Sequence, residues 1–298
     1  MPIEIRHLGS GEAASAESRH SVINPTSEPP VAPHQVSPLA IVTTSWDDGN
    51  PSDLRVAELL LRRGLRGTFY VPLNGYNGYR ALNRAEMRSL SEMGLEIGAH
   101  GVTHRTLSTL PPKEIAREVE VSKKELEDAL GEEVRMFCYP RGRYNAEVVR
   151  CLKRAGYSSA RTTRMLAHGL YFSPFHMPTT LQVYPHTKSD YLRNLVRARS
   201  VTRLLEYLTQ YRQLENWVAL GKKLFDVVLQ NGGIWHLYGH SWEIERLGLW
   251  EDLRTLLDYM GGREGVIYAS NGGALNHLHR DAPLQRRSKE NRENSLSS

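Results

Sequence analysis

The chain has 298 residues, of which 40% are apolar and 24% are charged, and its formal net charge is +5 at pH 7. This length is enough for one large α/β domain or two smaller ones, and this composition is typical of a soluble globular protein. The sequence has no run of eighteen apolar residues and no basic segment followed by an apolar one at its start, so it predicts neither a transmembrane helix nor a secretory signal. Its two cysteines, Cys138 and Cys151, are too few for a disulfide framework, and we therefore expect a cytoplasmic protein.

The two ends of the chain differ in composition from its middle. Residues 1–38 are rich in Ser, Pro, Glu and Ala, and residues 281–298 are mostly polar. Such segments bury too little apolar surface to fold, so we expect a disordered N-terminal arm and a disordered tail. The folded domain is then predicted to cover residues 39–280.

Short apolar runs alternate in this domain with amphipathic segments of helical length. In chain order we expect strand 39–46, helix 53–63, strand 67–72, helix 82–93, strand 95–100, helix 112–130, strand 134–140, helix 145–155, and strands 157–163, 179–185, 233–240 and 265–270. Strands that alternate with helices favour a parallel sheet, and seven to eight such units fit a closed or nearly closed (β/α) barrel. The predicted fold class is therefore α/β.

Residues 186–231 interrupt this alternation with two helix-like segments, and we interpret them as a helical insertion. Arg193, Arg197, Arg199 and Arg203 make the insertion strongly basic. One interpretation is a solvated helix face, and the other is attraction to an anionic partner such as a phosphate-bearing glycan carrier. No nucleic-acid-binding motif accompanies the arginines, so we predict no nucleic-acid partner.

Carboxylates and histidines follow the expected strands. Asp47 and Asp48 end the first strand in TTSWDDGN, and His100 and His104 follow the third in GAHGVTH. In a parallel α/β barrel the functional groups gather where the strands end. Two adjacent carboxylates need a nearby cation or screening by water, so the Asp pair is either a solvated turn or part of a cation site.

The two histidines of GAHGVTH are four residues apart. If residues 101–104 turn like the start of a helix, both rings lie on one face and can share a metal ion. His236 and His240 have the same spacing but are expected on a strand, where they lie about 13 Å apart and cannot share one.

Asp48, His100 and His104, the metal triad, form a three-ligand set that leaves coordination positions open, as in catalytic zinc sites. A zinc protease of the HExxH type needs Glu directly after the first histidine, and Gly101 stands there instead. We therefore predict a bound divalent metal. Zinc is the expected ion, although cobalt, nickel and iron accept the same ligands.

The segments TTSWDDG, HGVTH and FCYPRGRYN, followed by a late strand that ends in His240, resemble the motifs of the polysaccharide deacetylases. This family is also called carbohydrate esterase family 4 or the NodB-homology domain. The resemblance covers roughly residues 39–275 in motif order and spacing. It implies a distorted (β/α) barrel and metal-dependent hydrolysis of an N- or O-acetyl group on a sugar.

The resemblance also implies a role for each matching residue. The metal triad matches the family's metal ligands, and Asp47 matches the catalytic base that takes a proton from metal-bound water. His240 matches the general acid that protonates the leaving amine. The backbone N–H of Arg141 matches a donor that holds the developing oxyanion.

Three positions depart from the family's pattern. The third motif usually begins with an Arg that pairs with the catalytic Asp, and Cys138 stands at that place. We expect Arg161, or else the side chain of Arg141, to replace it, and prefer Arg161. The Asp-and-Trp fourth motif is not visible after Arg161, which leaves the partner of His240 open, and Gly101 replaces a common Ser or Thr. Cys138 as a nucleophile is the alternative, but an isolated strand-end cysteine is more typical of packing.

Aromatic residues flank these motifs at Trp46, Tyr139, Tyr238 and Trp242. They fit either core packing or stacking against sugar rings. We include Tyr139 with the two arginines above among the predicted substrate-binding residues.

The sequence thus predicts a cytoplasmic, metal-dependent N-deacetylase. Its expected substrate is an amino sugar or a glycan intermediate, free or linked to lipid or nucleotide. Two alternatives stay open: an amidohydrolase of the same fold acting on a non-sugar cyclic amide or imide, and a non-catalytic glycan-binding module. The acetyl linkage and the oligomeric state are left open too.

Overall fold

The computed structural model describes residues 38–214 and 216–280. The arm and the tail that the sequence predicts lie outside the described residues, except for residue 38. Within the described part, every helix is too short or too polar to span a bilayer.

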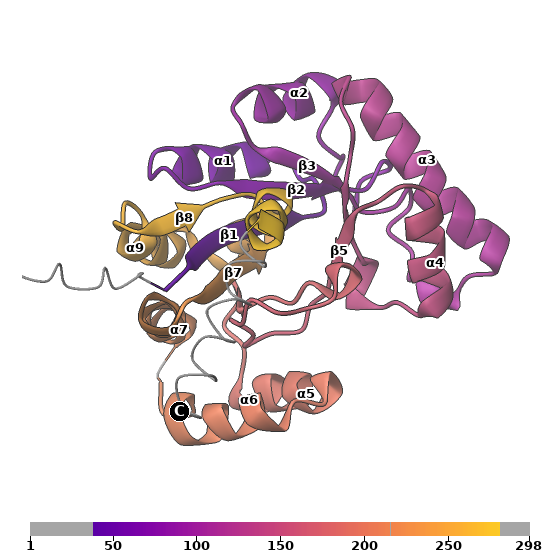
Figure 1. The fold of residues 1–298 in the computed structure, drawn as a ribbon. Coiled ribbons are helices and arrows are strands. Elements are labelled where there is room, and N and C mark those ends of the chain that lie inside the picture. The colour runs from indigo at the N-terminus through magenta and orange to yellow at the C-terminus, as the bar shows by residue number, and fades with distance from the viewer. Residues whose placement is uncertain (1–37, 215, 281–298) are drawn as a thin grey trace, which may run out of the picture. The chain divides into compact units, whose positions relative to one another are not determined.

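The described residues form one sheet of eight parallel strands (Figure 1). The strands are β1 (Ala40–Asp47), β2 (Gly67–Val71), β3 (Glu96–Ala99), β4 (Met136–Cys138), β5 (Ser159–Arg161), β6 (Leu181–Gln182), β7 (Gly233–Gly239) and β8 (Val266–Tyr268). Their order is β5-β4-β3-β2-β1-β7-β6, and β8 also pairs with β1. The sheet curls into a half-barrel, which confirms the predicted distorted (β/α) barrel.

Helices connect the strands, as the alternation predicts. They are α1 (Asp53–Leu61), α2 (Arg84–Glu92), α3 (Pro112–Leu130), α4 (Ala146–Arg154), α5 (Lys188–Ala198), α6 (Val201–Glu206), α7 (Trp217–Asn231), α8 (Ser241–Leu247) and α9 (Trp250–Met260). A π-helical turn (Tyr207–Tyr211) follows α6, and short 3₁₀ turns cover Leu107–Thr109, Pro140–Gly142 and Pro174–His176.

The strand β1 is the central element of the sheet. All eight of its residues are buried, because the chain packs on both of its faces and pairs with it along both edges. Thr44 lies opposite Gly67 of β2 and opposite Leu237 of β7. Such burial on both faces accounts for its nearly unbroken apolar and small sequence.

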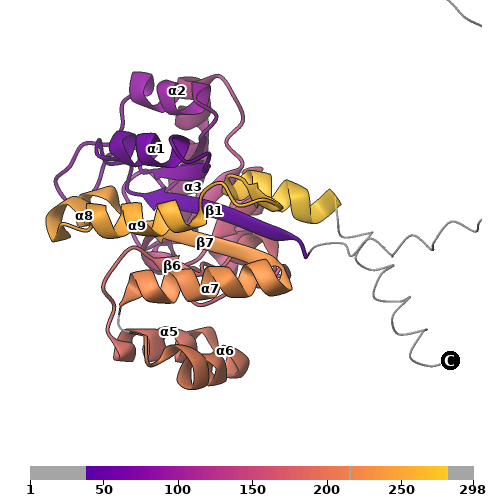
Figure 2. The same ribbon diagram turned by 90° about the vertical axis from the view of Figure 1, so that its left-hand side faces the viewer.

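The predicted insertion over residues 186–231 contains α5, α6 and α7. Its helices lie in two places: α7 lies beside β7, whereas α5 and α6 form the outermost layer beyond α7 (Figures 1 and 2). The side chain of Trp235 in β7 donates to the Gly221 carbonyl of α7 at 3.1 Å. The helix α7 therefore covers the sheet, and α5 and α6 extend away from it.

The parallel sheet brings five strand ends to one edge. Asp47 ends β1, Cys138 ends β4 and Arg161 ends β5, while His100 and His240 directly follow β3 and β7. Since the carboxyl ends of parallel strands meet at the same rim, residues far apart in the sequence lie together there.

Candidate active site

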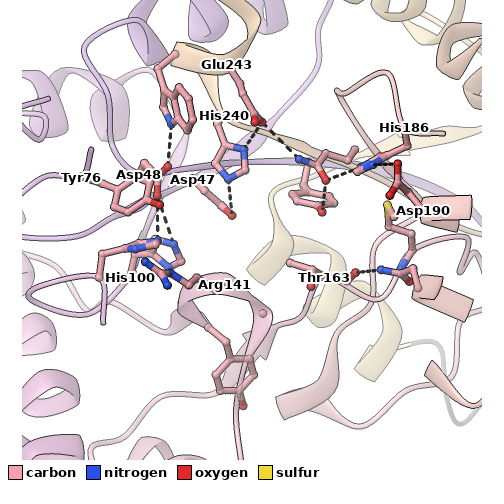
Figure 3. A pocket seen from close by; sticks show the side chains of 18 of the residues that line it. Asp47, Asp48, Tyr76, His100, Arg141, Thr163, His186, Asp190, His240 and Glu243 are labelled. Atoms are coloured by element: carbon pink, nitrogen blue, oxygen red, sulfur yellow. Dashed lines mark hydrogen bonds and ion pairs between the residues drawn. The ribbon is translucent and has the colours of Figure 1, made fainter. Parts of the chain in front are cut away.

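A cavity of about 530 Å³ opens at this rim. Its walls include nearly all of the residues that the sequence predicts for the site. These are Asp47, Asp48, His100, His104, Tyr139, Arg141 and His240. Figure 3 shows the carboxylates and His100 at one end and His186 and Asp190 at the other.

The Asp-Asp-Gly turn separates the two adjacent carboxylates. Asp48 and Gly49 both have left-handed backbone conformations, with φ of 76° and 57°. A Cβ atom on Gly49 would lie 2.9 Å from Cγ1 of Val71, so this turn requires glycine. As a result, Asp47 contacts Arg161, whereas Asp48 contacts His100 and His104.

The metal triad is assembled in the structure. Asp48 Oδ1 lies 3.2 Å from Nε2 of His104 and 3.7 Å from Nε2 of His100. All three side chains are buried, and their ligand atoms lie within 4.8 Å of one another. Oδ1 of Asp48 has no hydrogen-bond partner among the described residues, although it is buried. A buried carboxylate oxygen facing two imidazole nitrogens is suited to a cation, so these residues fit a divalent metal.

Neighbouring groups orient His100 and Asp48 and determine the protonation of His100. Nδ1 of His100 lies 2.8 Å from the carbonyl oxygen of Cys138, so we assign the proton to Nδ1 and leave Nε2 directed toward Asp48. Burial lowers the pKa of His100 to about 4, which keeps the ring neutral, as a metal ligand must be. The indole of Trp242 donates to Oδ2 of Asp48 at 2.8 Å and orients that carboxylate.

The loop after β3 positions His104 without a helix, so the expected helical turn at residues 101–104 is wrong. Gly101 and His104 have left-handed φ angles of 79° and 55°. The buried Glu118 of α3 fixes this loop, because its Oε2 accepts from the backbone N–H groups of Val102 at 2.7 Å and Thr103 at 3.0 Å, and its Oε1 accepts from the Thr103 hydroxyl. The two histidine rings are thereby held with their centroids 4.7 Å apart.

Asp47, His100 and Cys138 form a second group with metal-ligand spacing. Burial raises the pKa of the Cys138 thiol well above its usual value, so this sulfur is not a thiolate. Because Asp47 already pairs with Arg161, the triad fits a metal ion better than this second group, and the neutral thiol argues against Cys138 as a nucleophile.

Asp47 is held as a carboxylate. Burial alone would raise its pKa, but the Arg161 guanidinium, which donates to Oδ1, lowers it below the usual value. Arg161 is fully buried and lies against the rings of Tyr70 and Tyr238 at 5.4 and 4.7 Å. It does not line the cavity. Arg161, which we expected to replace the family's motif arginine at the position of Cys138, thus lies beneath the cavity and pairs with Asp47.

His240 lies on the other side of Asp47 and has a partner that the sequence did not reveal. Its Nδ1 lies 2.8 Å from Oε2 of Glu243, and its Nε2 lies 3.9 Å from Oδ2 of Asp47. Burial lowers the pKa of His240, but the hydrogen bond to Glu243 and the charges of Asp47 and Asp48 outweigh it and raise the pKa to about 9. The imidazole is therefore protonated at neutral pH and able to donate a proton.

A chain of polar contacts continues from Glu243 across the cavity floor (Figure 3). Its Oε2 accepts from Nε2 of Gln182 at 3.5 Å, and Oε1 of Gln182 contacts Nε2 of His186 and the hydroxyl of Tyr238 at 2.8 and 2.6 Å. Glu243 stands three residues after His240 in the first turn of α8, and this spacing is the only sequence signal for the pair.

The turn Pro140–Gly142 forms one wall. Arg141 is left-handed, with φ of 57°, and the two hydrogen bonds of the turn run from Gly142 N–H to the Tyr139 carbonyl and from Arg143 N–H to the Pro140 carbonyl. Neither bond uses the N–H of Arg141. The Tyr139 hydroxyl instead donates to the Phe175 carbonyl at 3.0 Å, and its ring is buried. Tyr139 thus shapes the wall from below.

Aromatic rings cover the metal triad from the side of the 74–79 loop. The ring of Tyr76 lies 3.9 Å from that of His104, and Tyr79 stacks on Trp242 with centroids 6.3 Å apart. Trp46, by contrast, is fully buried, and its indole donates to Thr44. From the sequence, Trp242 is one of four aromatic residues that flank the motifs and is not assigned to the site, and Tyr76 is missed, because the latter follows no strand end directly.

Part of the chain resembles known proteins in sequence. Residues 36–160 match the family model of polysaccharide deacetylase. Over 123 residues the chain is 26% identical to YxkH of Bacillus subtilis (strain 168), which is described as a candidate polysaccharide deacetylase. That alignment covers 41% of this chain and 44% of the relative, so the chain spans less than half of the relative's length.

Solved structures show the same fold. A candidate polysaccharide deacetylase from Mycobacterium smegmatis superposes with a TM-score of 0.59 at 17% identity, covering 83% of this chain and 92% of that one. The Xyl-CE4 domain of a multidomain xylanase from the hindgut metagenome of Trinervitermes trinervoides gives 0.50 at 14%, covering 80% and 91%. A mutant of a CE4 family pseudoenzyme with restored enzymatic activity gives 0.50 at 16%, covering 81% and 69%.

The matched segment carries the metal triad, Asp47 and the turn at Arg141, whereas Arg161 and His240 lie beyond it. The structural likeness covers 83% of the chain and so extends beyond this segment. Residues 36–160 therefore belong to the polysaccharide deacetylase family, as their motifs suggested.

Proposed function

We propose that this protein is a metal-dependent hydrolase that removes an acetyl group from the nitrogen of an amino sugar, in a glycan or a glycan intermediate. One observation carries the proposal. A buried triad of metal-ligand type lies in one cavity with a carboxylate held ionised and an imidazole held protonated. Hydrolysis of an amide requires these two groups in opposite protonation states.

Asp48, His100 and His104 would hold the metal ion. The ion supplies a Lewis acid that polarises a carbonyl oxygen and lowers the pKa of water. Two histidines and one carboxylate favour zinc and also accept cobalt, nickel or iron.

The side chains divide the proton transfers between them. Asp47 accepts a proton from the attacking water, and Arg161 keeps it ionised until then. His240 gives its Nε2 proton to the leaving amine, and Glu243, which accepts from Nδ1, keeps the imidazole protonated beforehand. The N–H of Arg141 donates to the carbonyl oxygen as negative charge develops there.

The aromatic rings at the cavity mouth would bind the sugar. Tyr76 and Trp242 present their faces beside the triad, and such rings pack against the apolar faces of sugars. We also propose that the protein acts in the cytoplasm. Its cysteines, Cys138 and Cys151, are both buried and unpaired, as is usual in a reducing compartment.

Acetate release tests this function. Metal-stripped protein is assayed on a panel of N- and O-acetylated sugars with and without added zinc. We expect release from an N-acetylated sugar only with metal. Asp47→Asn should lower kcat by about 10²- to 10⁴-fold while metal still binds, because it removes a general base. His100→Ala should lose both metal and activity.

Matched controls come from exposed positions outside the cavity. Asp252→Asn on α9 and His279→Ala repeat the same chemical changes away from the site and should leave acetate release unchanged. Hydrolysis of a cyclic imide without acetate release from sugars would reassign the substrate to a non-sugar amide. Metal binding and glycan binding without any hydrolysis would make the chain a binding module.

A further inference from the structure

A second cavity, of about 490 Å³, adjoins the first. The two share five lining residues: Arg141, Gly142, Thr163, Asn194 and Arg197. Four arginines line the second cavity, namely Arg141, Arg143, Arg164 and Arg197, and its lining contains no carboxylate. A molecule bound at the metal triad can therefore reach a strongly basic space without leaving the protein surface.

The charges of these arginines are not neutralised within the described residues. No carboxylate lies within 4.0 Å of any of the four there. Arg193, one helical turn before Arg197, shows the contrast, because it is paired with Asp190. Like charges that converge without a counter-charge repel one another, and an anion placed among them relieves that repulsion.

These four arginines come from three separate segments of the chain. Arg141 and Arg143 come from the turn after β4, Arg164 from the loop after β5, and Arg197 from α5.

Asn194 of α5 anchors that helix to the loop after β5. Its Oδ1 accepts from Met165 N–H and its Nδ2 donates to the Thr163 carbonyl, both at 2.9 Å. Gly142 lets the turn approach Thr163, because a Cβ atom on residue 142 would lie 2.1 Å from the Thr163 hydroxyl oxygen.

We propose that this second cavity, the arginine cavity, binds a phosphate group of the substrate. The inference rests on the proposed function and names its substrate class, a phosphorylated N-acetylated sugar. Guanidinium groups donate in pairs to phosphate oxygens, and the hydroxyls of Ser108 and Thr163 in the same lining add donors. The acetylated sugar lies at the triad while its phosphate lies among the arginines.

This assignment also gives α5 and α6 a role. The barrel strands and their connecting helices build the triad without them, but Arg197 comes from α5, and Arg203 at the start of α6 donates to the Met165 carbonyl at 3.2 Å. The two helices thus complete and brace the wall that faces the phosphate.

Substrate comparison tests the proposal. The holoenzyme is assayed on N-acetylglucosamine 1-phosphate and on its uncharged methyl glycoside, and kcat/KM is measured for each. We expect the phosphate to be preferred at least about 10-fold, the usual effect of hydrogen bonds to a charged group. Arg197→Glu should remove most of this preference. Arg212→Glu, at an exposed arginine that lines neither cavity, should keep it.

Two carriers distinguish the source of the phosphate. A nucleotide-linked N-acetylhexosamine and a polyprenyl-phosphate-linked one in detergent are compared, and the better substrate identifies the carrier. Equal kcat/KM for the phosphorylated and uncharged sugars, or a preference that survives Arg197→Glu, would overturn the proposal. A preference for a hexuronic acid over the phosphate would reassign the cavity to carboxylates.

Binding measured by calorimetry tests the phosphate site separately from the proposed reaction. Binding of N-acetylglucosamine 1-phosphate is titrated into wild type and Arg197→Glu independently of turnover. Phosphate-dependent binding without acetate release would contradict the proposed reaction and retain the arginine cavity. Acetate release without phosphate-dependent binding would support the proposed reaction and contradict the phosphate site in the arginine cavity.

Discussion

Glu243 is the hydrogen-bond partner of the His240 imidazole, whose Nδ1 lies 2.8 Å from its carboxylate, and with the charges of Asp47 and Asp48 it raises the pKa of that ring. Because the folded pKa of about 9 lies above the ordinary value of 6.5, the charged imidazole stabilises the fold below pH 6.5. That contribution is lost as the pH rises through about 9. In the proposed reaction the same titration removes the proton that His240 gives to the leaving amine, so activity should fall on the alkaline side.

Glu243→Gln removes the negative charge beside this imidazole while keeping the shape of the side chain. We expect the alkaline limb of kcat in the metal-bound enzyme to move to lower pH, because the variant His240 loses its proton more readily. A pH–rate profile of wild type and variant, both loaded with metal, measures the shift. Glu245→Gln, on the exposed side of the same helix, should leave the limb in place; an unmoved limb in Glu243→Gln would refute the pairing.

At the residue scale, the sequence predicts the groups that sit at strand ends. Asp47, Asp48, His100 and His240 were found because each ends or follows a recognisable strand. Glu118 and Tyr76 were not, since one is a single glutamate among the many charged residues of a helix and the other lies in a loop without a strand signal. The contacts that Glu118 and Tyr76 make in the site can be seen only in the folded structure.

At the scale of elements, α3 supports the loop that carries His104. Glu118 accepts two backbone N–H groups and one hydroxyl from residues 102 and 103. These bonds hold a left-handed backbone at His104, a conformation that costs energy in residues other than glycine. The helix and the loop thus act as one unit.

Glu118→Gln should weaken metal binding without unfolding the protein. The neutral amide accepts hydrogen bonds from the loop less strongly, and losing such outer contacts typically costs about 10- to 100-fold in metal affinity. Competition with a chelator measures the affinity. Glu120→Gln, exposed on the same helix, is the matched control. Equal affinities in Glu118→Gln and wild type would show that the loop holds its shape alone.

Element type is readable in this sequence where periodicity is strong. The helix α3 and the strands β1 and β7 match the expected segments closely. The strands β4, β5 and β6 contain only two or three residues each, fewer than their apolar runs suggest. The turn at residues 101–104 escaped prediction because Glu118, distant in sequence, determines its shape.

At the scale of the whole molecule, metal binding should stabilise the fold. The triad joins β1 to the loop after β3, and a ligand that binds only the folded state adds about 2.7 kcal/mol at 100 times its Kd. We expect zinc to raise the unfolding temperature of metal-stripped protein by several degrees, measured by calorimetry. His104→Ala should abolish the increase, whereas His279→Ala should retain it; an increase of equal size in His104→Ala would place the metal elsewhere.

The place of β1 at the centre of the sheet has a consequence for biosynthesis. Its partners β7 and β8 come from the other end of the chain. One edge of β1 therefore stays unpaired until β7 is made, and the start of the other edge, beside β2, stays unpaired until β8 is made. Roughly 190 residues separate Asp47 from His240, which a ribosome adds in about 10 to 40 s. Exposed strand edges recruit other chains during such intervals. Translation that stops before β7 should therefore leave an aggregation-prone product without His240, the proposed general acid. We expect a nascent chain of this protein to need protection until nearly its last strand emerges.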